Sequence, residues 1–320
     1  MKEITIIMGY NAAGKSTLVE EYVQKGYYRI NRDTTGGTLD GQVDHVRRAV
    51  AAGNTKVVLD NTYRNSEARA EIIAYAVNEG IPINCVHLDT SFEDAQLNAC
   101  FRQVKRLGRL LMPEDYKTMK DPNLFPPAAL FSYRKQFEAP TTAEGFAKVE
   151  TVPFVRKPLP AEYDGWALIL DYDDNLRTST GDEKFPCTKD DVQLLPGRKV
   201  RINAYMKEME KKYGKPGKLL GWSNQSGVGK GTLTLEACKE CFDHTNTLLG
   251  LDIEYYFCPH RSPPAVFCYC RKPAPGNGVV MIEKHKLDPK KCLYVGDQTS
   301  DKTAATRLGM QFLHTDEFFK

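Results

Sequence analysis

Near the N-terminus, the sequence GYNAAGKS fits the phosphate-loop pattern G-x-x-x-x-G-K-[ST]. In such a loop Gly9 and Gly14 permit a tight turn that aims backbone N–H groups at phosphate oxygens. Lys15 neutralises phosphate charge, and the Ser16 hydroxyl binds Mg²⁺. Thr17 opens the helical stretch behind the loop and is expected to bind the nucleotide as well. Because an apolar stretch precedes the loop, the pattern predicts a nucleoside triphosphate site rather than a chance turn.

Polar side chains at the ends of two later apolar stretches are candidates for an acceptor site. Asp33 follows residues 28–30, and a carboxylate there can act as general base toward an attacking hydroxyl. The alternative is that Asp33 only caps a turn. Residues 60–62, Asp-Asn-Thr, follow residues 57–59. They can hold a water on Mg²⁺, a nucleotide, or only the turn.

A basic stretch follows in the first half. Its cations recur at spacings of three and four, so several share one helical face. They can form a lid that neutralises charge on a transferred phosphoryl group, or simply a solvated basic face. The residues are Arg102, Lys105, Arg106 and Arg109.

The second half contains a pair of carboxylates directly after an apolar stretch. Asp171 and Asp173 repel each other unless they share a cation, which predicts Mg²⁺ bound by both. With the metal, Asp171 can attack phosphorus, and Asp173 can protonate the leaving oxygen and later activate water. A D-x-D sequence after a strand is also compatible with a purely structural pair.

Three further pieces follow this pair in chain order. Ser223 ends an apolar stretch and offers a hydroxyl to a phosphoryl group. Lys272 supplies a cation that offsets negative charge. Asp297 and Asp301 follow another apolar stretch and are additional candidate Mg²⁺ ligands. Such groups are expected together because catalytic residues line the carboxyl edge of a parallel sheet.

Four potential metal ligands lie close together in the sequence. Cys258, Cys268 and Cys270 accompany His260, whereas the other cysteines are scattered. Three thiolates and one imidazole suit tetrahedral Zn²⁺ with no open position, so the predicted zinc ion is structural. The alternative is a set of buried free cysteines.

The elements that position these residues alternate between apolar β-like runs and helical stretches. This alternation predicts the α/β class, with parallel βαβ units in two parallel-sheet domains. The aperiodic segment 151–165 contains three prolines and suggests the boundary, giving domains over 1–158 and 159–320. The expected strands are residues 4–8, 28–30, 57–59, 83–88, 166–170, 219–222, 253–257 and 293–295, with a last one near Phe312.

Composition limits the range of functions. The 320 residues are enough for two domains, and a hydrophobic share of 41% supports packed cores. No apolar run is long enough to span a bilayer, and the apolar start leads directly into the phosphate loop, so we interpret it as a strand rather than a signal peptide. A net charge of +3, spread over both halves, lacks the footprint of a protein that grips long nucleic acid. Any contact with nucleic acid should be local, such as at a strand end.

The first half resembles the kinase domain of polynucleotide kinase/phosphatases. The likeness rests on the phosphate loop, NRD at 31–33, VVLDNT and YRKQFEAPT, and covers most of residues 1–155. It implies ATP as phosphate donor, Asp33 as general base and Arg102 as a lid arginine, with 5′-hydroxyl ends of DNA or RNA as acceptors. Two positions depart from the pattern. Ala12 lies where glycine is frequent, and Cys100 stands where a lid arginine is usual.

The second half resembles the haloacid dehalogenase superfamily over about residues 164–314. SNQSG, CRKP and VGD are similar to histidinol-phosphate and heptose-bisphosphate phosphatases and to the phosphatase half of polynucleotide kinase/phosphatases. The C-x-H and C-x-C pairs resemble the zinc loop of the first two. Asp174 departs from the usual glycine after D-x-D, and Asn175 follows it.

Together these likenesses imply a bifunctional end-repair enzyme that phosphorylates 5′-hydroxyl ends and removes 3′-phosphates, using ATP, Mg²⁺ and a structural Zn²⁺. We expect it in the cytoplasm of a bacterial or virus-infected cell, or in the nucleus, with nucleic-acid ends and nucleotide as partners and no membrane. A homo-oligomer and the choice of DNA or RNA stay open. The alternatives are a sugar or nucleoside kinase fused to a sugar-phosphate phosphatase, and a non-catalytic binding protein.

Overall fold

The computed structural model describes residues 2–261 and 267–320. Its contacts form two compact units. The first unit comprises Met1–Ala99 and Met119–Lys157, and the second comprises Cys100–Thr118 and Pro158–Lys320. The division after residue 157 lies inside the predicted linker, but residues 100–118, assigned to the first domain from the sequence, group with the second unit. Among the described residues, no helix combines the length and apolar character that crossing a bilayer requires.

The first unit is built on a five-stranded parallel sheet with strand order β2-β3-β1-β4-β5. The central strand β1 reads EITIIM and is buried from its second residue on, as expected for a parallel strand covered on both faces. The strands are β1 (Glu3–Met8), β2 (Tyr28–Ile30), β3 (Lys56–Asp60), β4 (Ile83–Asp89) and β5 (Lys148–Pro153).

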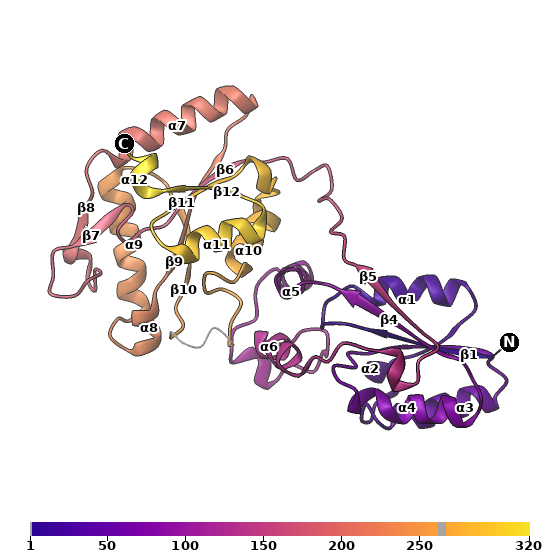
Figure 1. Ribbon diagram of the computed structural model, residues 1–320. Coiled ribbons are helices and arrows are strands. Elements are labelled where there is room, and N and C mark those ends of the chain that lie inside the picture. Colours follow the sequence, from indigo (N-terminus) through magenta and orange to yellow (C-terminus); the bar gives the residue numbers. More distant parts are fainter. Residues whose placement is uncertain (1, 262–266) are drawn as a thin grey trace. The chain divides into compact units, whose positions relative to one another are not determined.

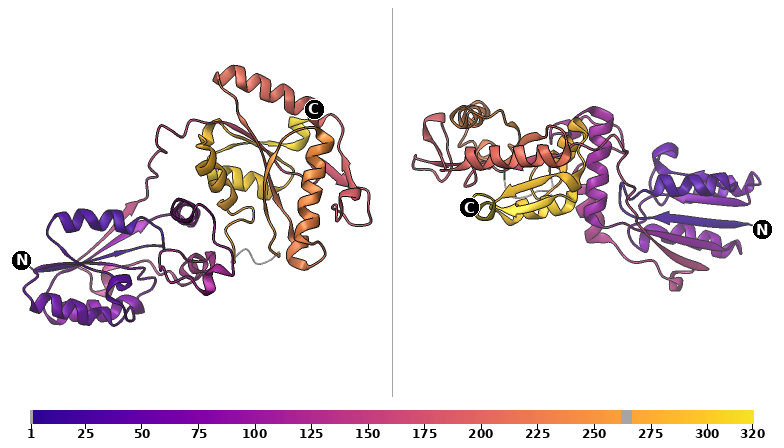
Figure 2. Two further views of the ribbon diagram at one scale, coloured as in Figure 1. Left: turned by 180° about the vertical axis from the view of Figure 1, so that it is seen from behind. Right: turned by 90° about the horizontal axis from the view of Figure 1, so that it is seen from above.

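Helices cover both faces of this sheet (Figures 1 and 2). Val19 of α1 packs on one face against Ile7, Val58 and Val86, and α3 and α4 pack on the other around Ile4 and Ile6. The helices are α1 (Lys15–Gln24), α2 (Arg32–Thr35), α3 (Gln42–Ala51), α4 (Glu67–Asn78), α6 (Pro127–Gln136) and the 3-10 helix η2 (Thr142–Glu144). Helix α5 (Phe92–Leu107) begins in the first unit, and its residues from Cys100 onward belong to the second.

A buried ion pair and the end of the YRKQFEAPT stretch both contact the start of α4. Arg69 is fully buried and donates to both carboxylate oxygens of Glu144 at 2.7 and 2.9 Å. It also donates to the carbonyls of Tyr63 and Glu138, while the Glu138 carboxylate accepts from the backbone and hydroxyl of Ser66. The segment therefore clamps the start of α4.

The second unit repeats the design with strand order β10-β9-β6-β11-β12, all parallel. A separate antiparallel hairpin, β7–β8, follows β6. The strands are β6 (Ala167–Leu170), β7 (Arg177–Ser179), β8 (Val192–Leu194), β9 (Lys218–Asn224), β10 (Glu254–Cys258), β11 (Leu293–Gly296) and β12 (Gln311–His314).

The second sheet is also covered on both faces. Leu168 and Leu170 pack against Ile202 of α7, Phe242 of α9 and Phe318 of α12, whereas α10 and α11 lie on the opposite face (Figure 1). The helices are α7 (Arg198–Tyr213), α8 (Ser226–Lys230), α9 (Leu235–Leu249), α10 (Gly276–His285), α11 (Thr299–Leu308) and α12 (Thr315–Phe318). Short 3-10 helices are η1 (Asp115–Lys117), η3 (Lys189–Asp191) and η4 (Pro289–Lys291).

These sheets confirm the predicted α/β class with two parallel-sheet domains. Every strand expected from the sequence is present, with ends shifted by up to two residues. The sequence reading missed β5 and the β7–β8 hairpin. Most residues of β5 are exposed, and the strand ends in proline, so it has no apolar pattern and was interpreted partly as linker.

Candidate active sites and metal cluster

The phosphate loop connects β1 to α1, as its sequence predicts. Gly14 has φ 100° immediately before the helix, and Gly9 lies so close to β4 that a Cβ there would be 3.0 Å from the carbonyl oxygen of Leu88. Lys15 Nζ donates to the carbonyls of Gly9 and Tyr10 at 3.0 and 2.7 Å. Ser16 is exposed at the first turn of α1. The loop thus has the backbone form that a phosphate site requires.

Side chains from α5 and from the residue after β4 contact the outer turn of this loop. Ala12 has φ 61°, a left-handed conformation that glycine adopts more easily. Asn98 Nδ2 donates to the carbonyl of Ala12 at 2.9 Å, and the Thr90 hydroxyl donates to the carbonyl of Ala13 at 2.9 Å. These two bonds hold the backbone of the loop at the strained position of Ala12.

Asp33 and residues 60–61 follow adjacent parallel strands, so they lie at the same edge of the sheet as the phosphate loop. Asp33 is exposed in the first turn of α2, and its backbone N–H donates to Asn31 Oδ1 at 2.8 Å. Asp60 is buried and paired with Arg29, and Asn61 accepts from the backbone of Arg32. Asp33 is therefore exposed to solvent, whereas Asp60 and Asn61 contact Arg29 and the backbone of Arg32.

The predicted lid residues are on α5 or the loop after it, in the second unit. Arg102 is half-buried. Lys105 lies 3.7 Å from Glu283, and Arg109 forms two hydrogen bonds with Asp115. Cys100 is fully buried, which raises the pKa of its thiol well above the ordinary value. The Cys100 side chain is therefore not exposed at the surface of α5 where a lid residue could reach a phosphate.

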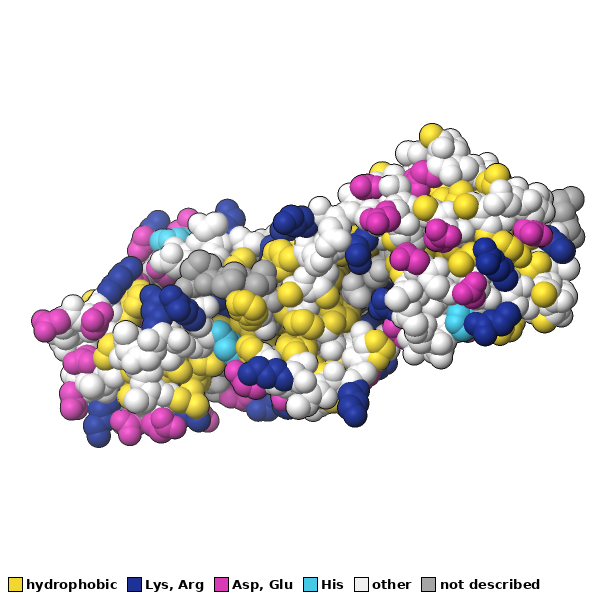
Figure 3. All heavy atoms as spheres, turned by 90° about the horizontal axis from the view of Figure 1, so that it is seen from below, with side chains coloured by type: hydrophobic (Ala, Val, Ile, Leu, Met, Phe, Trp, Pro, Cys, Tyr) yellow, Lys and Arg dark blue, Asp and Glu magenta, His cyan; other side chains and the backbone are white. Residues whose placement is uncertain are grey.

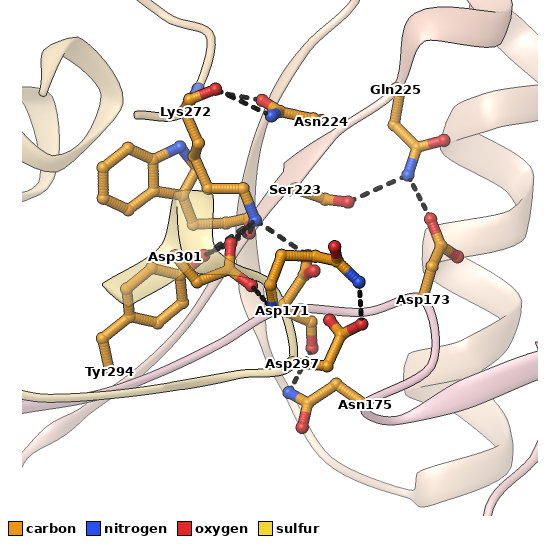
Figure 4. Close-up of polar contacts among 12 residues, drawn as sticks. Asp171, Asp173, Asn175, Ser223, Asn224, Gln225, Lys272, Tyr294, Asp297 and Asp301 are labelled. Atoms are coloured by element: carbon orange, nitrogen blue, oxygen red, sulfur yellow. Dashed lines mark hydrogen bonds and ion pairs between the residues drawn. The ribbon is translucent and has the colours of Figure 1, made fainter. Parts of the chain in front are cut away.

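The second site gathers four predicted residues at the carboxyl edge of the second sheet (Figure 4). Lys272 Nζ lies 3.1 Å from Asp171 and 2.7 Å from Asp301, and all three side chains are buried. Oxygens of Asp171, Asp297 and Asp301 lie within 4.8 Å of one another. Gly296 makes this approach possible, since a Cβ there would be 2.4 Å from an Asp301 oxygen.

Burial and the neighbouring charges shift the pKa values of the groups in this cluster. Burial raises the pKa of Asp171 to about 7, opposed by Lys272 and reinforced by Asp301. Burial alone lowers the pKa of Lys272, but the Asp171 and Asp301 carboxylates outweigh it and raise that pKa above its ordinary value. Among the described residues, Asp297 Oδ1 and Asp171 Oδ1 are buried with no hydrogen-bond donor, although Lys272 lies near the latter. Unsatisfied carboxylate oxygens at this spacing fit a hard divalent cation.

Of the four carboxylates predicted to bind Mg²⁺, Asp301 lies with Asp171 and Asp297 in the group that could hold a metal, and Asp173 does not. Asp301 is engaged by Lys272, by the Tyr294 hydroxyl and by the backbone of Gln298. Asp173 is outside the carboxylate group that can hold a metal within the described part of the chain. Asp171 and Asp297 are therefore the better candidates for side-chain ligands.

Asp173 instead belongs to a hydrogen-bonded row with Ser223. Gln225 Nε2 donates to Asp173 Oδ2 at 2.7 Å and to Ser223 Oγ at 2.9 Å. Ser223 Oγ accepts this bond, so its own proton remains available for a phosphoryl oxygen. Gln225 lies within the SNQSG motif, but the sequence does not predict its role, because spacing alone does not show which side chain bridges two others.

Asn175 fixes the loop between these groups. Its amide donates to the carbonyls of Asp171 at 2.7 Å and Val295 at 3.3 Å, and its oxygen accepts from the Thr315 hydroxyl. Asp174 has φ 58°, another left-handed position where the superfamily usually has glycine. The loop thus keeps its form despite the substituted sequence.

The cysteine cluster has the dimensions of a tetrahedral metal site. Cys258 Sγ lies 3.8 Å from Cys268 Sγ and 3.4 Å from His260 Nδ1, which lies 3.2 Å from Cys270 Sγ. Zn–S bonds of about 2.3 Å in a tetrahedron place two sulfurs about 3.8 Å apart. The sulfurs are too far apart for a disulfide. The four side chains thus fit zinc.

Two family models match the chain. A model described as AAA domain matches residues 4–106, and one described as Polynucleotide kinase 3 phosphatase matches residues 167–320. The bifunctional polynucleotide phosphatase/kinase of Schizosaccharomyces pombe is 33% identical over 169 residues, which is 52% of this chain and 36% of the yeast protein. The probable D-glycero-D-manno-heptose-1,7-bisphosphate 7-phosphatase of Thermoplasma volcanium is 37% identical over 95 residues, 28% of this chain and 64% of that protein.

The similarity to solved structures is weaker than the similarity to these relatives. The D,D-heptose 1,7-bisphosphate phosphatase of B. bronchiseptica, crystallised with magnesium and phosphate, has 25% identity and a TM-score of 0.38, covering 46% of this chain and 78% of that one. The assignment therefore rests on the sheet topologies, the two sites and the family models. Residues 4–106 are thus similar to the family described as AAA domain, and residues 167–320 to the family described as Polynucleotide kinase 3 phosphatase.

Proposed function

We propose that the protein repairs nucleic-acid ends by transferring phosphate from ATP to 5′-hydroxyls and by removing 3′-phosphates. The observation that carries the proposal is the presence of a complete phosphate loop and a complete Asp171–Lys272 cluster on one chain whose second half matches the 3′-phosphatase family. The name of the yeast relative, which unites both activities, supports it.

In the kinase reaction, the loop amides, Lys15, Ser16 and Thr17 bind the ATP phosphates. Asp33 takes the proton of the attacking 5′-hydroxyl as the oxygen–phosphorus bond forms and the bond to ADP breaks. Arg102 is assigned to charge neutralisation in the lid. The exposed position of Asp33 supports its role, because the base must reach a polymer end outside the protein core.

In the phosphatase reaction, an Asp171 oxygen attacks phosphorus and the bond to the 3′-oxygen breaks. Asp173 gives its proton to that oxygen. Asp173 then takes a proton from water, which attacks the aspartyl-phosphate and releases inorganic phosphate. Ser223 and Lys272 bind the phosphoryl oxygens throughout.

Three metal sites accompany this assignment, two for Mg²⁺ and one for Zn²⁺. Ser16 would hold Mg²⁺ in the kinase site, and Asp171 and Asp297 would hold it in the phosphatase site. When bound, Mg²⁺ supplies positive charge that lowers repulsion between phosphate and the carboxylates. A structural Zn²⁺ would be held by Cys258, His260, Cys268 and Cys270. Because these four side chains would fill all four coordination positions, the ion would have no open position for substrate and no part in the chemistry.

The distribution of charge agrees with contact limited to a strand end. On the face drawn in Figure 3, Lys and Arg side chains are interspersed with Asp and Glu, and neither unit taken by itself shows a continuous basic stripe there. A protein that follows a long duplex needs such a stripe to neutralise many phosphates.

A second candidate is a small-molecule kinase joined to a sugar-phosphate phosphatase. Identity of 37% to a heptose-bisphosphate phosphatase favours it, as does the cysteine cluster that resembles the zinc loop of such enzymes. The match to the 3′-phosphatase family favours nucleic acid.

A competition between substrates tests the proposal. Labelled phosphate transfer from ATP is measured to a 5′-hydroxyl oligonucleotide and to a panel of sugars, and phosphate release is measured from a 3′-phosphorylated oligonucleotide and from sugar phosphates. We expect both reactions on the oligonucleotides. Transfer and release with sugars alone would establish the second candidate.

A further inference from the structure

Arg177 is a buried cation beside the phosphatase site, and the mechanism above does not use it. Its side chain is 1% exposed. The guanidinium carbon lies 5.3 Å from the ring centroid of Tyr172 and 4.8 Å from that of Phe242, and Nη1 donates to the Thr245 hydroxyl at 3.0 Å. A buried charge is costly unless it is paired, so its carboxylate partner matters.

That partner is Asp173. Arg177 Nε donates to Asp173 Oδ1 at 2.8 Å. Backbone bonds close the turn between them, since the N–H of Asp174 donates to the carbonyl of Arg177 and the N–H of Arg177 donates to the carbonyl of Tyr172. The guanidinium is therefore held under the carboxylate by both backbone and side-chain contacts.

The two oxygens of Asp173 have different anchors. Oδ1 accepts from Arg177, and Oδ2 accepts from Gln225, which also contacts Ser223. With both oxygens engaged, rotation of the carboxylate breaks at least one charge-assisted or buried hydrogen bond. The position of Asp173 is thereby tied to that of Ser223.

We propose that Arg177 is a positioning residue that holds Asp173 where it can protonate the leaving oxygen of the substrate. This inference rests on the proposed phosphatase function. A displacement of about 1 Å in a reacting group can cost about 100-fold in rate. General-acid help matters most for a strongly basic leaving group, such as the alkoxide of a nucleotide 3′-oxygen, and least for a weakly basic one.

The test compares two substrates that differ in whether their leaving group needs a proton from a general acid. For Arg177→Met and wild type, kcat/KM is measured with a 3′-phosphorylated oligonucleotide and with p-nitrophenyl phosphate, whose leaving group departs without a proton. The constant kcat/KM reports only the steps up to loss of the leaving group, so hydrolysis of the aspartyl-phosphate does not enter. We expect a loss of about 100-fold on the oligonucleotide and of less than about threefold on p-nitrophenyl phosphate.

Two further variants separate positioning from folding. Arg177→Lys keeps the charge but loses the fork of donors, so we expect a smaller preferential loss on the oligonucleotide. Arg201→Ala removes another arginine of the second unit, one that contacts Phe318 outside the site, and should leave the ratio of the two rates unchanged. If Arg177→Met does not fold, the Arg177→Lys ratio decides alone.

The outcomes are distinct. Equal losses on both substrates, or no loss on either, would overturn the role of Arg177 and leave the phosphatase function intact. A wild-type protein that hydrolyses neither substrate would instead refute the proposed phosphatase function itself.

Discussion

Replacing Asp171 with asparagine should stabilise the second unit at neutral pH and abolish the phosphatase activity proposed above. Asp171 is 6% exposed, and Lys272 is the cation that faces both Asp171 and Asp301. When both acids are ionised, this group carries one more negative than positive charge. A buried imbalance of this kind lowers stability, and the substitution removes it.

The expected magnitude follows from the pKa of Asp171, which burial raises from 3.8 to about 7. An acid whose pKa is raised on folding destabilises the fold only at pH values where the same acid is ionised in the unfolded protein. The penalty is absent below a pH of about 4, grows between about 4 and 7, and is complete above that. The difference in pKa corresponds to about 4 kcal/mol, which is the largest gain expected for Asp171→Asn at pH 8.

Urea unfolding followed by tryptophan fluorescence measures this gain, because both tryptophans of the chain, Trp166 and Trp222, are buried in the second unit. The experiment uses a chelator and a series of pH values, with the exposed Asp182→Asn as control. Mg²⁺ should stabilise wild type and so reduce the difference in unfolding free energy between wild type and Asp171→Asn. Equal stability of wild type and Asp171→Asn at pH 8, or a gain that does not change with pH, would refute the charge imbalance.

Three other substitutions test separate parts of the structure. Cys258→Ser should lower the zinc content from about one ion per chain and destabilise the second unit, while the buried Cys292→Ser should leave zinc content unchanged; elemental analysis distinguishes them. Ala12→Gly should raise the unfolding free energy of the first unit by roughly 0.5–1 kcal/mol, since the φ of 61° at residue 12 favours glycine. A lower unfolding free energy of the variant in a denaturant titration would count against this. Arg69→Met should cost about 3–5 kcal/mol because it leaves Glu144 without its buried partner, and thermal unfolding followed by circular dichroism measures it.

The strands could be predicted from the sequence because both sheets are parallel and are covered by helices on both faces. Strands such as β1 and β6 are buried on both faces, so they appear as unbroken apolar runs. The exposed edge strand β5 and the β7–β8 hairpin have no such pattern. Residues 100–118 group by their contacts with the second unit, and chain order does not show which core a helix end joins.

At the phosphatase site, the sequence predicted the residues better than their partners. Asp171, Lys272, Asp297 and Asp301 follow apolar strands or a loop motif, and the structure brings them together. The pairing of Asp173 with Arg177 was not foreseen. A charge four residues further on usually signals a helical pair, whereas here a closed turn creates it.

The central claim is that two independent phosphate sites act on one kind of substrate. A single oligonucleotide with a 5′-hydroxyl and a 3′-phosphate, incubated with ATP and Mg²⁺ and analysed at both ends, tests it most directly. Wild type should phosphorylate the 5′ end and clear the 3′ end. Lys15→Ala should retain only the 3′ reaction, and Asp171→Asn only the 5′ reaction. Wild type that leaves both ends unchanged, or one substitution that abolishes both reactions, would contradict the account.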